Sequence, residues 1–152
     1  MGRPRRDGKQ VAPAADSGPL PRVLFVCIEN SNRSQMAQAF AQIYGAGVVE
    51  ALSAGSRPSG RVNPRAIAAR AERGYDLSTH VSRGLDAIPA GTYRTVVNMG
   101  CGDECPWIPA QQREDWDLSD PRDLAPAEFN AVRDTIERRV VALLATVAAE
   151  KR

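Results

Sequence analysis

The segment that decides the fold reads VLFVCIENSNRS over residues 23–34. Its first four residues are apolar, and a short run of this kind is typical of a strand buried on both faces. The run ends on Cys27, after which apolar residues recur at helical spacing over residues 36–44 and Gly45 supplies a stop. The segment therefore predicts a buried strand, a loop and a helix.

Further strands are predicted outward from this unit, at residues 48–52, 95–99 and, with a weaker pattern, 115–118. Between the second and the third of the four predicted strands, Asn63 has the character of an N-cap and opens a helix that runs towards Gly74. Strands and helices thus alternate, which favours parallel strand pairing.

The closing segment predicts a long amphipathic helix with Pro126 near its start. Its apolar positions at steps of three and four are Phe129, Val132, Ile136, Val140, Leu143 and Val147. Together the elements predict an α/β fold with three layers, α/β/α, around a central four-stranded parallel sheet. Ligands of such folds bind at the carboxyl ends of the strands, where Cys27, Cys101 and Asp120 all follow predicted strands.

Composition predicts one domain, over residues 22–152, behind a disordered tail over residues 1–21 that is rich in proline and charge. The net charge of +2 comes from 20 basic and 18 acidic residues that are mixed along the chain, so no nucleic-acid partner is expected. No signal peptide and no membrane-spanning segment is recognisable, which predicts a cytoplasmic protein without a membrane partner. Three cysteines in such a chain favour thiol chemistry or metal binding over structural disulfides.

Cys27 and Arg33 have five residues between them, in a loop that leads into a helix. Backbone N–H groups and the helix dipole make such a loop a site for a tetrahedral oxyanion, to which Arg33 adds a planar guanidinium. The same positive field favours the thiolate of Cys27 and so makes it a nucleophile. Ser34 can donate a hydrogen bond to its sulfur, and Asn30 can brace the loop. The candidate oxyanion-binding residues are Asn30, Ser31, Asn32, Arg33 and Ser34. The competing interpretation is a buried core cysteine and a solvated arginine.

Two further cysteines, Cys101 and Cys105, are four positions apart. Their Cα atoms would lie about 13 Å apart in an extended chain and about 6 Å apart in a turned one, and only the turned chain permits a disulfide. Two other uses stay open: a zinc site completed by Cys27 and His80, and a pair of inert buried thiols. Asp120 precedes a proline, where its carboxyl group can serve as a general acid or can belong to a simple turn.

The chain resembles the thiol-dependent arsenate reductases related to low-molecular-weight phosphatases, from about Arg22 to the end of the last helix. The motifs that carry the resemblance are Val23-Leu24-Phe25-Val26-Cys27, Asn30-Ser31, Arg33-Ser34-Gln35-Met36-Ala37, Ser53-Ala54-Gly55, Val62-Asn63-Pro64-Arg65-Ala66, Met99-Gly100-Cys101 and Asp115-Trp116 through Asp120-Pro121.

The resemblance implies that Cys27 attacks arsenate held by Arg33 and the loop amides, while Asp120 protonates the departing oxygen. Cys101 then attacks the sulfur of the Cys27 adduct and arsenite leaves, and Cys105 attacks Cys101 to leave a Cys101–Cys105 disulfide. Thioredoxin is the implied reductant, with a low-molecular-weight thiol as the other possibility. Neither a cofactor nor a bound metal is expected.

Relatives of this kind can hold a potassium ion with an Asn, a Glu, a Ser and an Asp. Asn30 and Ser53 match two of these, whereas Gln38 and Arg83 stand at the acidic positions. The resemblance therefore predicts no potassium site, with the Arg83 cation as the hypothesised substitute.

Three aromatic residues are expected to have structural roles: His80, which matches a histidine of the family, and Trp107 and Trp116, which are expected to pack beside the site. The first alternative function is a phosphatase acting on phosphotyrosine or small phosphate esters. Such enzymes typically carry aromatic residues after the Asp-Pro pair, where this chain has Arg122 and Asp123. The second alternative is a non-catalytic regulator that binds an oxyanion or a metal.

Overall fold

The structure is a computed structural model, and it describes residues 20–30, 32–57, 60, 62–72, 74, 77, 80, 82–100, 107–118 and 124–150. Four of the predicted site residues lie outside the described residues, namely Ser31, Cys101, Cys105 and Asp120. The same holds for residues 1–19 of the predicted tail.

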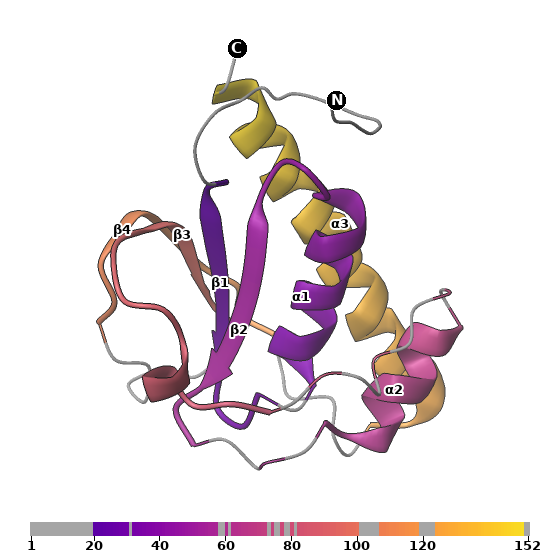
Figure 1. The fold of residues 1–152 in the computed structure, drawn as a ribbon. Coiled ribbons are helices and arrows are strands. Elements are labelled where there is room, and N and C mark those ends of the chain that lie inside the picture. Colours follow the sequence, from indigo (N-terminus) through magenta and orange to yellow (C-terminus); the bar gives the residue numbers. More distant parts are fainter. Residues whose placement is uncertain are drawn as a thin grey trace, which may run out of the picture.

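A sheet of four parallel strands forms the centre of the molecule, in the order β2-β1-β3-β4. The strands are β1 (Arg22–Cys27), β2 (Glu50–Gly55), β3 (Tyr93–Asn98) and β4 (Ala110–Asp115). All four end at the same edge, because Cys27 pairs with Gly55, Val26 with Asn98, and Asn98 with Asp115. This edge lies away from the C-terminal end of α3 (Figure 1).

The predicted strands at 23–26 and 95–99 agree with β1 and β3 to within two residues. The prediction for β2, residues 48–52, began two residues early and ended three residues early. Its end was missed because pairing with β1 continues through small buried residues to Gly55. The predicted strand at 115–118 was wrong, since β4 ends at Asp115. β4 is an edge strand whose side chains are mostly polar and exposed, so no apolar pattern marks it.

Three α-helices are described: α1 (Arg33–Tyr44), α2 (Pro64–Ala71) and α3 (Pro126–Glu150). α2 begins as predicted, with the Asn63 side chain accepting a hydrogen bond from the backbone N–H of Arg65 at 2.8 Å. The predicted long helix is α3, which buries all of its predicted apolar positions fully or in part. None of the described helices is long and apolar enough to cross a membrane.

The two faces of the sheet are covered differently. One face packs against α1 and α3 in the larger core, which includes Val23, Phe25 and Ile136. On the other face, a smaller core around Leu24 and Val26 is covered by the 3-10 helix η2 (Leu85–Ala87) and the segments beside it (Figure 1). The predicted α/β architecture with a parallel sheet is confirmed, and in the described residues its thin outer layer is η2.

Candidate active site

The loop that follows β1 turns sharply at Asn30, whose φ of 53° lies in the left-handed region. This turn brings the loop backbone against Gly55 at the end of β2. A Cβ atom on Gly55 would lie 2.5 Å from the carbonyl oxygen of Ile28 and 2.8 Å from the nitrogen of Asn30. Position 55 therefore requires glycine, and the close contact with the end of β2 fixes the path of the loop. The resemblance included Gly55 without giving it this role.

The sulfur of Cys27 is buried at the centre of the loop, with 3% of the residue exposed. The backbone N–H of Asn30 donates to Sγ at 3.3 Å, and the hydroxyl of Ser34 lies 2.8 Å from it. The Ser34 oxygen also accepts a hydrogen bond from the Asn30 side-chain amide at 2.8 Å, which directs the hydroxyl proton towards the sulfur. Both donors would stabilise a thiolate at Cys27.

Gln35, in the first turn of α1, fixes Asn30 from behind. Its amide nitrogen donates to the backbone oxygen of Asn30 at 3.1 Å and to its side-chain oxygen at 2.9 Å. Both amide protons are thus used, and the Gln35 oxygen accepts from Nδ1 of His80 at 2.9 Å. Sequence reasoning gave Gln35 no role, because its function depends on a tertiary contact with His80.

His80 lies half-buried against this network. Burial lowers its pKa below the usual value, and the nearby cations of Arg83 and Arg70 lower it further. At neutral pH the imidazole is therefore neutral, with its proton on Nδ1, where Gln35 accepts it. A series of hydrogen bonds runs from His80 through Gln35 and Asn30 to Cys27. It links a titrating imidazole to the loop, although the imidazole does not itself bond to the sulfur.

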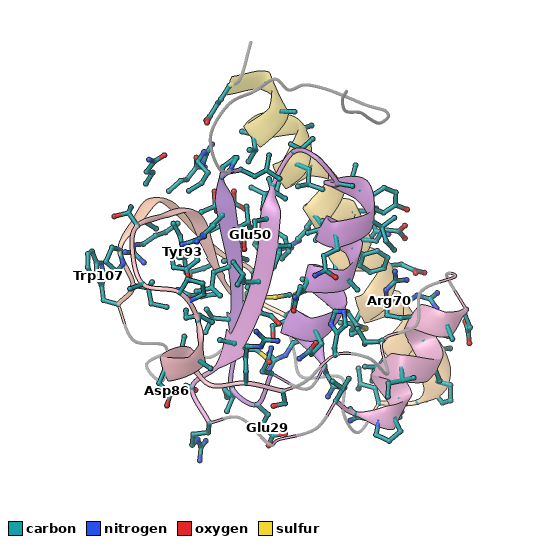
Figure 2. All side chains as sticks on the ribbon, viewed as in Figure 1. Glu29, Glu50, Arg70, Asp86, Tyr93 and Trp107 are labelled. Carbon is teal, nitrogen blue, oxygen red and sulfur yellow. The ribbon has the colours of Figure 1, made fainter. Side chains whose placement is uncertain are left out.

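A second brace on the loop comes from the segment before η2. The Ser82 hydroxyl donates to the backbone oxygen of Glu29 at 2.8 Å, and the backbone N–H of Arg83 donates to the side-chain oxygen of Asn30 at 2.9 Å. Figure 2 shows Glu29 at the outer end of the molecule, below the edge where the strands end. Ser82 is a loop residue in no motif, so sequence reasoning missed it.

Arg33, the first residue of α1, is buried, with 4% exposed. Its Nη1 donates to the backbone oxygen of Leu118 at 2.8 Å. This bond uses one of the five N–H donors of the guanidinium. Gly100 lies against the same group, because a Cβ atom there would be 2.4 Å from Nη1 of Arg33 and 2.7 Å from the Leu118 oxygen. The chain after β3 and the chain after β4 therefore both meet the loop at Arg33.

The groups expected to match a potassium site are occupied by protein partners in the described residues. The Asn30 side-chain oxygen accepts two N–H groups, from Gln35 and from the backbone of Arg83. The Ser53 hydroxyl donates to the side-chain oxygen of Gln38. The Asn30 oxygen therefore uses both of its lone pairs on N–H groups. The hypothesis that the Arg83 cation replaces potassium stays a prediction. The zinc alternative involves Cys101 and Cys105 and so lies outside the described residues.

The two tryptophans differ in how much of each residue is exposed. Trp116 packs as expected, since it is 5% exposed and its ring centroid lies 5.9 Å from that of Phe25. The packing prediction for Trp107 was wrong, because 75% of that residue is exposed. Trp107 precedes β4 on the thinly covered face of the sheet, where the described residues form no α-helix that could bury it.

Comparison with known proteins places this site in a family context. The family model described as low molecular weight phosphotyrosine protein phosphatase matches residues 22–152. A glutaredoxin arsenate reductase from Synechocystis is 39% identical over 132 residues, which are 85% of this chain and 100% of that protein. An arsenate reductase from Staphylococcus aureus is 38% identical over 119 residues, which are 76% of this chain and 89% of that protein.

Solved structures agree with this. An arsenate reductase in the phosphate-binding state superposes with a TM-score of 0.76 at 38% identity, covering 84% of this chain and 99% of that one. A thioredoxin-dependent arsenate reductase from Corynebacterium glutamicum superposes with a TM-score of 0.72 at 30% identity, covering 90% of this chain and 66% of that one.

Proposed function

Since this chain belongs to the low molecular weight phosphotyrosine protein phosphatase family, we propose that it is an arsenate reductase with Cys27 as nucleophile. Cys101 and Cys105 are assigned as its first and second relay thiols. The observation that carries the proposal is the position of Gly100 against Arg33, beside the loop that holds Cys27. Cys101 is the residue that follows Gly100 in the sequence.

In the first step the Cys27 thiolate attacks arsenic, and an oxygen leaves as water. Arg33 and the loop amides, including those of Asn30 and Ser31, hold the arsenate oxygens, with Asn32 and Ser34 completing the loop. Asp120 supplies the proton for the departing oxygen, as a general acid. The hydrogen bond from Arg33 to Leu118 supports this role, because residue 120 is two positions further along the chain.

In the second step the Cys101 thiolate attacks Sγ of Cys27. The electron pair of the S–As bond stays on arsenic, which is thereby reduced from As(V) to As(III), and arsenite leaves. A Cys27–Cys101 disulfide remains. Cys105 then attacks Cys101, which releases the Cys27 thiolate and leaves a Cys101–Cys105 disulfide.

An external dithiol returns the two electrons by exchange with this disulfide. We propose thioredoxin as that reductant. The Corynebacterium relative is named as thioredoxin-dependent, and the Synechocystis relative is named as a glutaredoxin arsenate reductase. Glutaredoxin with glutathione is therefore the alternative that an assay must include.

The test is arsenate-dependent NADPH oxidation with thioredoxin and thioredoxin reductase, comparing the wild type with Cys105→Ser. The wild type should turn over continuously, whereas the variant should release about one arsenite per chain and stop. A variant that turns over as fast as the wild type would refute the relay. Hydrolysis of 4-nitrophenyl phosphate without any arsenate reduction would identify the chain as a phosphatase instead.

A further inference from the structure

The side-chain amide of Gln35 lies at the centre of the hydrogen bonds behind the Cys27 loop. Gln35, Asn30 and Ser34 are all 0% exposed, so bulk water does not compete for the bonds between them. The Gln35 amide bonds to Asn30 and to His80 rather than to the sulfur. The influence of Gln35 on Cys27 therefore passes through Asn30.

The orientation of the Gln35 amide is fixed from both ends. The backbone oxygen of Asn30 can only accept, so the Gln35 atom that faces it at 3.1 Å is the nitrogen. The Gln35 oxygen then faces Nδ1 of His80 at 2.9 Å, where an imidazole can donate. An amide that was turned over would place its oxygen against the carbonyl oxygen of Asn30. The N–H groups of Gln35 must therefore point to Asn30.

The orientation of the Asn30 side chain follows from the same reasoning. Its oxygen accepts from Gln35 at 2.9 Å and from the backbone N–H of Arg83, also at 2.9 Å. If the Asn30 amide were turned over, its own N–H groups would face these two donors. Its nitrogen must therefore face Ser34, to which it donates at 2.8 Å. Because the Ser34 oxygen accepts this bond, the hydroxyl proton is left for the Cys27 sulfur, 2.8 Å away.

We infer that Gln35 is a positioning residue for the nucleophile. Its amide holds Asn30 in the orientation that turns the Ser34 hydroxyl towards the sulfur. Without Gln35, the Arg83 N–H would be the one described donor left on the Asn30 side-chain oxygen. The Ser34 hydroxyl could then donate to Asn30 instead, and the thiolate would lose a donor. The inference rests on the proposed function, because that function makes Cys27 the nucleophile.

The test measures the reactivity of Cys27 without arsenate. In a Cys101→Ser, Cys105→Ser background Cys27 is the one remaining cysteine, and its rate of alkylation by iodoacetamide reports the thiolate. Gln35→Met has a side chain of similar length that donates no hydrogen bond. It should slow alkylation at pH 6 by about fivefold or more, because less of the thiol is ionised. At pH 9.5, where the thiol ionises in both chains, the two rates should agree within about twofold.

Two further variants separate positioning from packing. Gln35→Leu also lacks a donor but differs in shape from methionine, so it should give the same pH dependence as Gln35→Met. The matched control is Gln38→Met, one turn further along α1, whose amide bonds to Ala51 and Ser53 on β2 rather than to the loop. It should match the background chain at both pH values. Equal slowing at pH 6 and pH 9.5 in both Gln35 variants would indicate a disrupted loop and overturn the inference.

A double-mutant cycle tests whether Gln35 acts through Ser34. Ser34→Ala removes the hydroxyl that Gln35 directs, so adding Gln35→Met to it should slow alkylation at pH 6 by less than about twofold. The inference is overturned if Gln35→Met alone has no effect at pH 6, or if it slows the Ser34→Ala chain by its full factor. A wild-type chain that never converts arsenate, although the alkylation rates follow this pattern, would refute the proposed function and leave the positioning role standing.

Discussion

Ser34 is the side chain that most directly sets the state of the Cys27 sulfur. Its hydroxyl lies 2.8 Å from Sγ, and its oxygen is held by Asn30. We predict that Ser34→Ala lowers kcat/KM for arsenate by about ten- to a hundredfold, because a hydrogen bond to a charged group stabilises it by about 1.5–3 kcal/mol. In a Cys101→Ser, Cys105→Ser background, alkylation of Cys27 by iodoacetamide at pH 6 should also slow.

The control for this prediction is Ser56→Ala, a serine whose buried hydroxyl has no described partner. Its arsenate kinetics and alkylation rate should match those of the wild type. Equal alkylation rates for Ser34→Ala and the wild type would show that Ser34 does not stabilise the thiolate.

Gly100 allows a second test at the residue scale. Its φ is 84°, and an added Cβ would lie 2.4 Å from Nη1 of Arg33. Gly100→Ala should therefore displace Arg33 and weaken arsenate or phosphate binding by at least about tenfold, with a loss of stability of about 1–3 kcal/mol. Isothermal titration calorimetry with phosphate measures the effect on binding, and urea unfolding measures the loss of stability.

Gly47 provides the matched control, since its φ of 77° is similar but nothing lies within 4 Å of an added Cβ. Gly47→Ala should lose only about 1 kcal/mol of stability, because alanine disfavours the left-handed conformation, and it should keep its affinity for phosphate. If both variants bind phosphate as the wild type does, the close approach at Arg33 has no functional consequence.

At the scale of elements, α1 and β2 meet at two of the positions that the resemblance compared with a potassium site. Here Gln38 on α1 and Ser53 on β2 bond to each other, and Asn30 is held by Gln35 and Arg83. We predict that replacing sodium by potassium at constant ionic strength changes neither Tm nor arsenate turnover. Clear stimulation by potassium would overturn this prediction.

A double variant, Gln38→Glu with Arg83→Asp, serves as the positive control. It supplies two carboxylates beside the oxygens of Asn30 and Ser53, and hard oxygen ligands favour alkali and alkaline-earth cations. Its Tm should rise on addition of potassium. Comparing the Tm response of the double variant with that of the wild type shows whether the side chains at positions 38 and 83, rather than the fold, decide potassium binding.

At the scale of the whole molecule, His80 makes global stability depend on pH. Its pKa is lowered, by burial first and then by Arg83 and Arg70, so below about pH 6.5 the unfolded chain binds a proton that the folded chain resists. Stability should therefore fall as pH drops from about 7.5 through 6, and the loss should level off below the folded-state pKa.

His80→Asn keeps a donor for Gln35 but does not titrate. Urea unfolding between pH 5 and 8 should show a smaller loss of stability on acidification in this variant than in the wild type. Identical pH profiles would show that His80 is not the group responsible. Carboxylates affect both proteins alike, because they titrate mainly at lower pH.

The sequence by itself determined the order and type of the elements at the centre of this molecule. Apolar runs identified β1 and β3, Asn63 and Pro64 identified the start of α2, and helical spacing identified α3. These signals are local, because burial and capping depend on neighbours along the chain. β4 was misplaced because an edge strand with polar side chains carries no such signal.

Only the tertiary structure decided which distant residues support the loop at Cys27. Sequence reasoning proposed Cys27, Arg33, Asn30 and Ser34 from their spacing. It gave no role to Gln35, His80 or Ser82 as braces of the loop, and it expected Trp107 to pack beside the site, where the residue is in fact 75% exposed. Contacts between strands and loops far apart in sequence depend on how parallel strands bring their carboxyl ends together, and no local pattern records them.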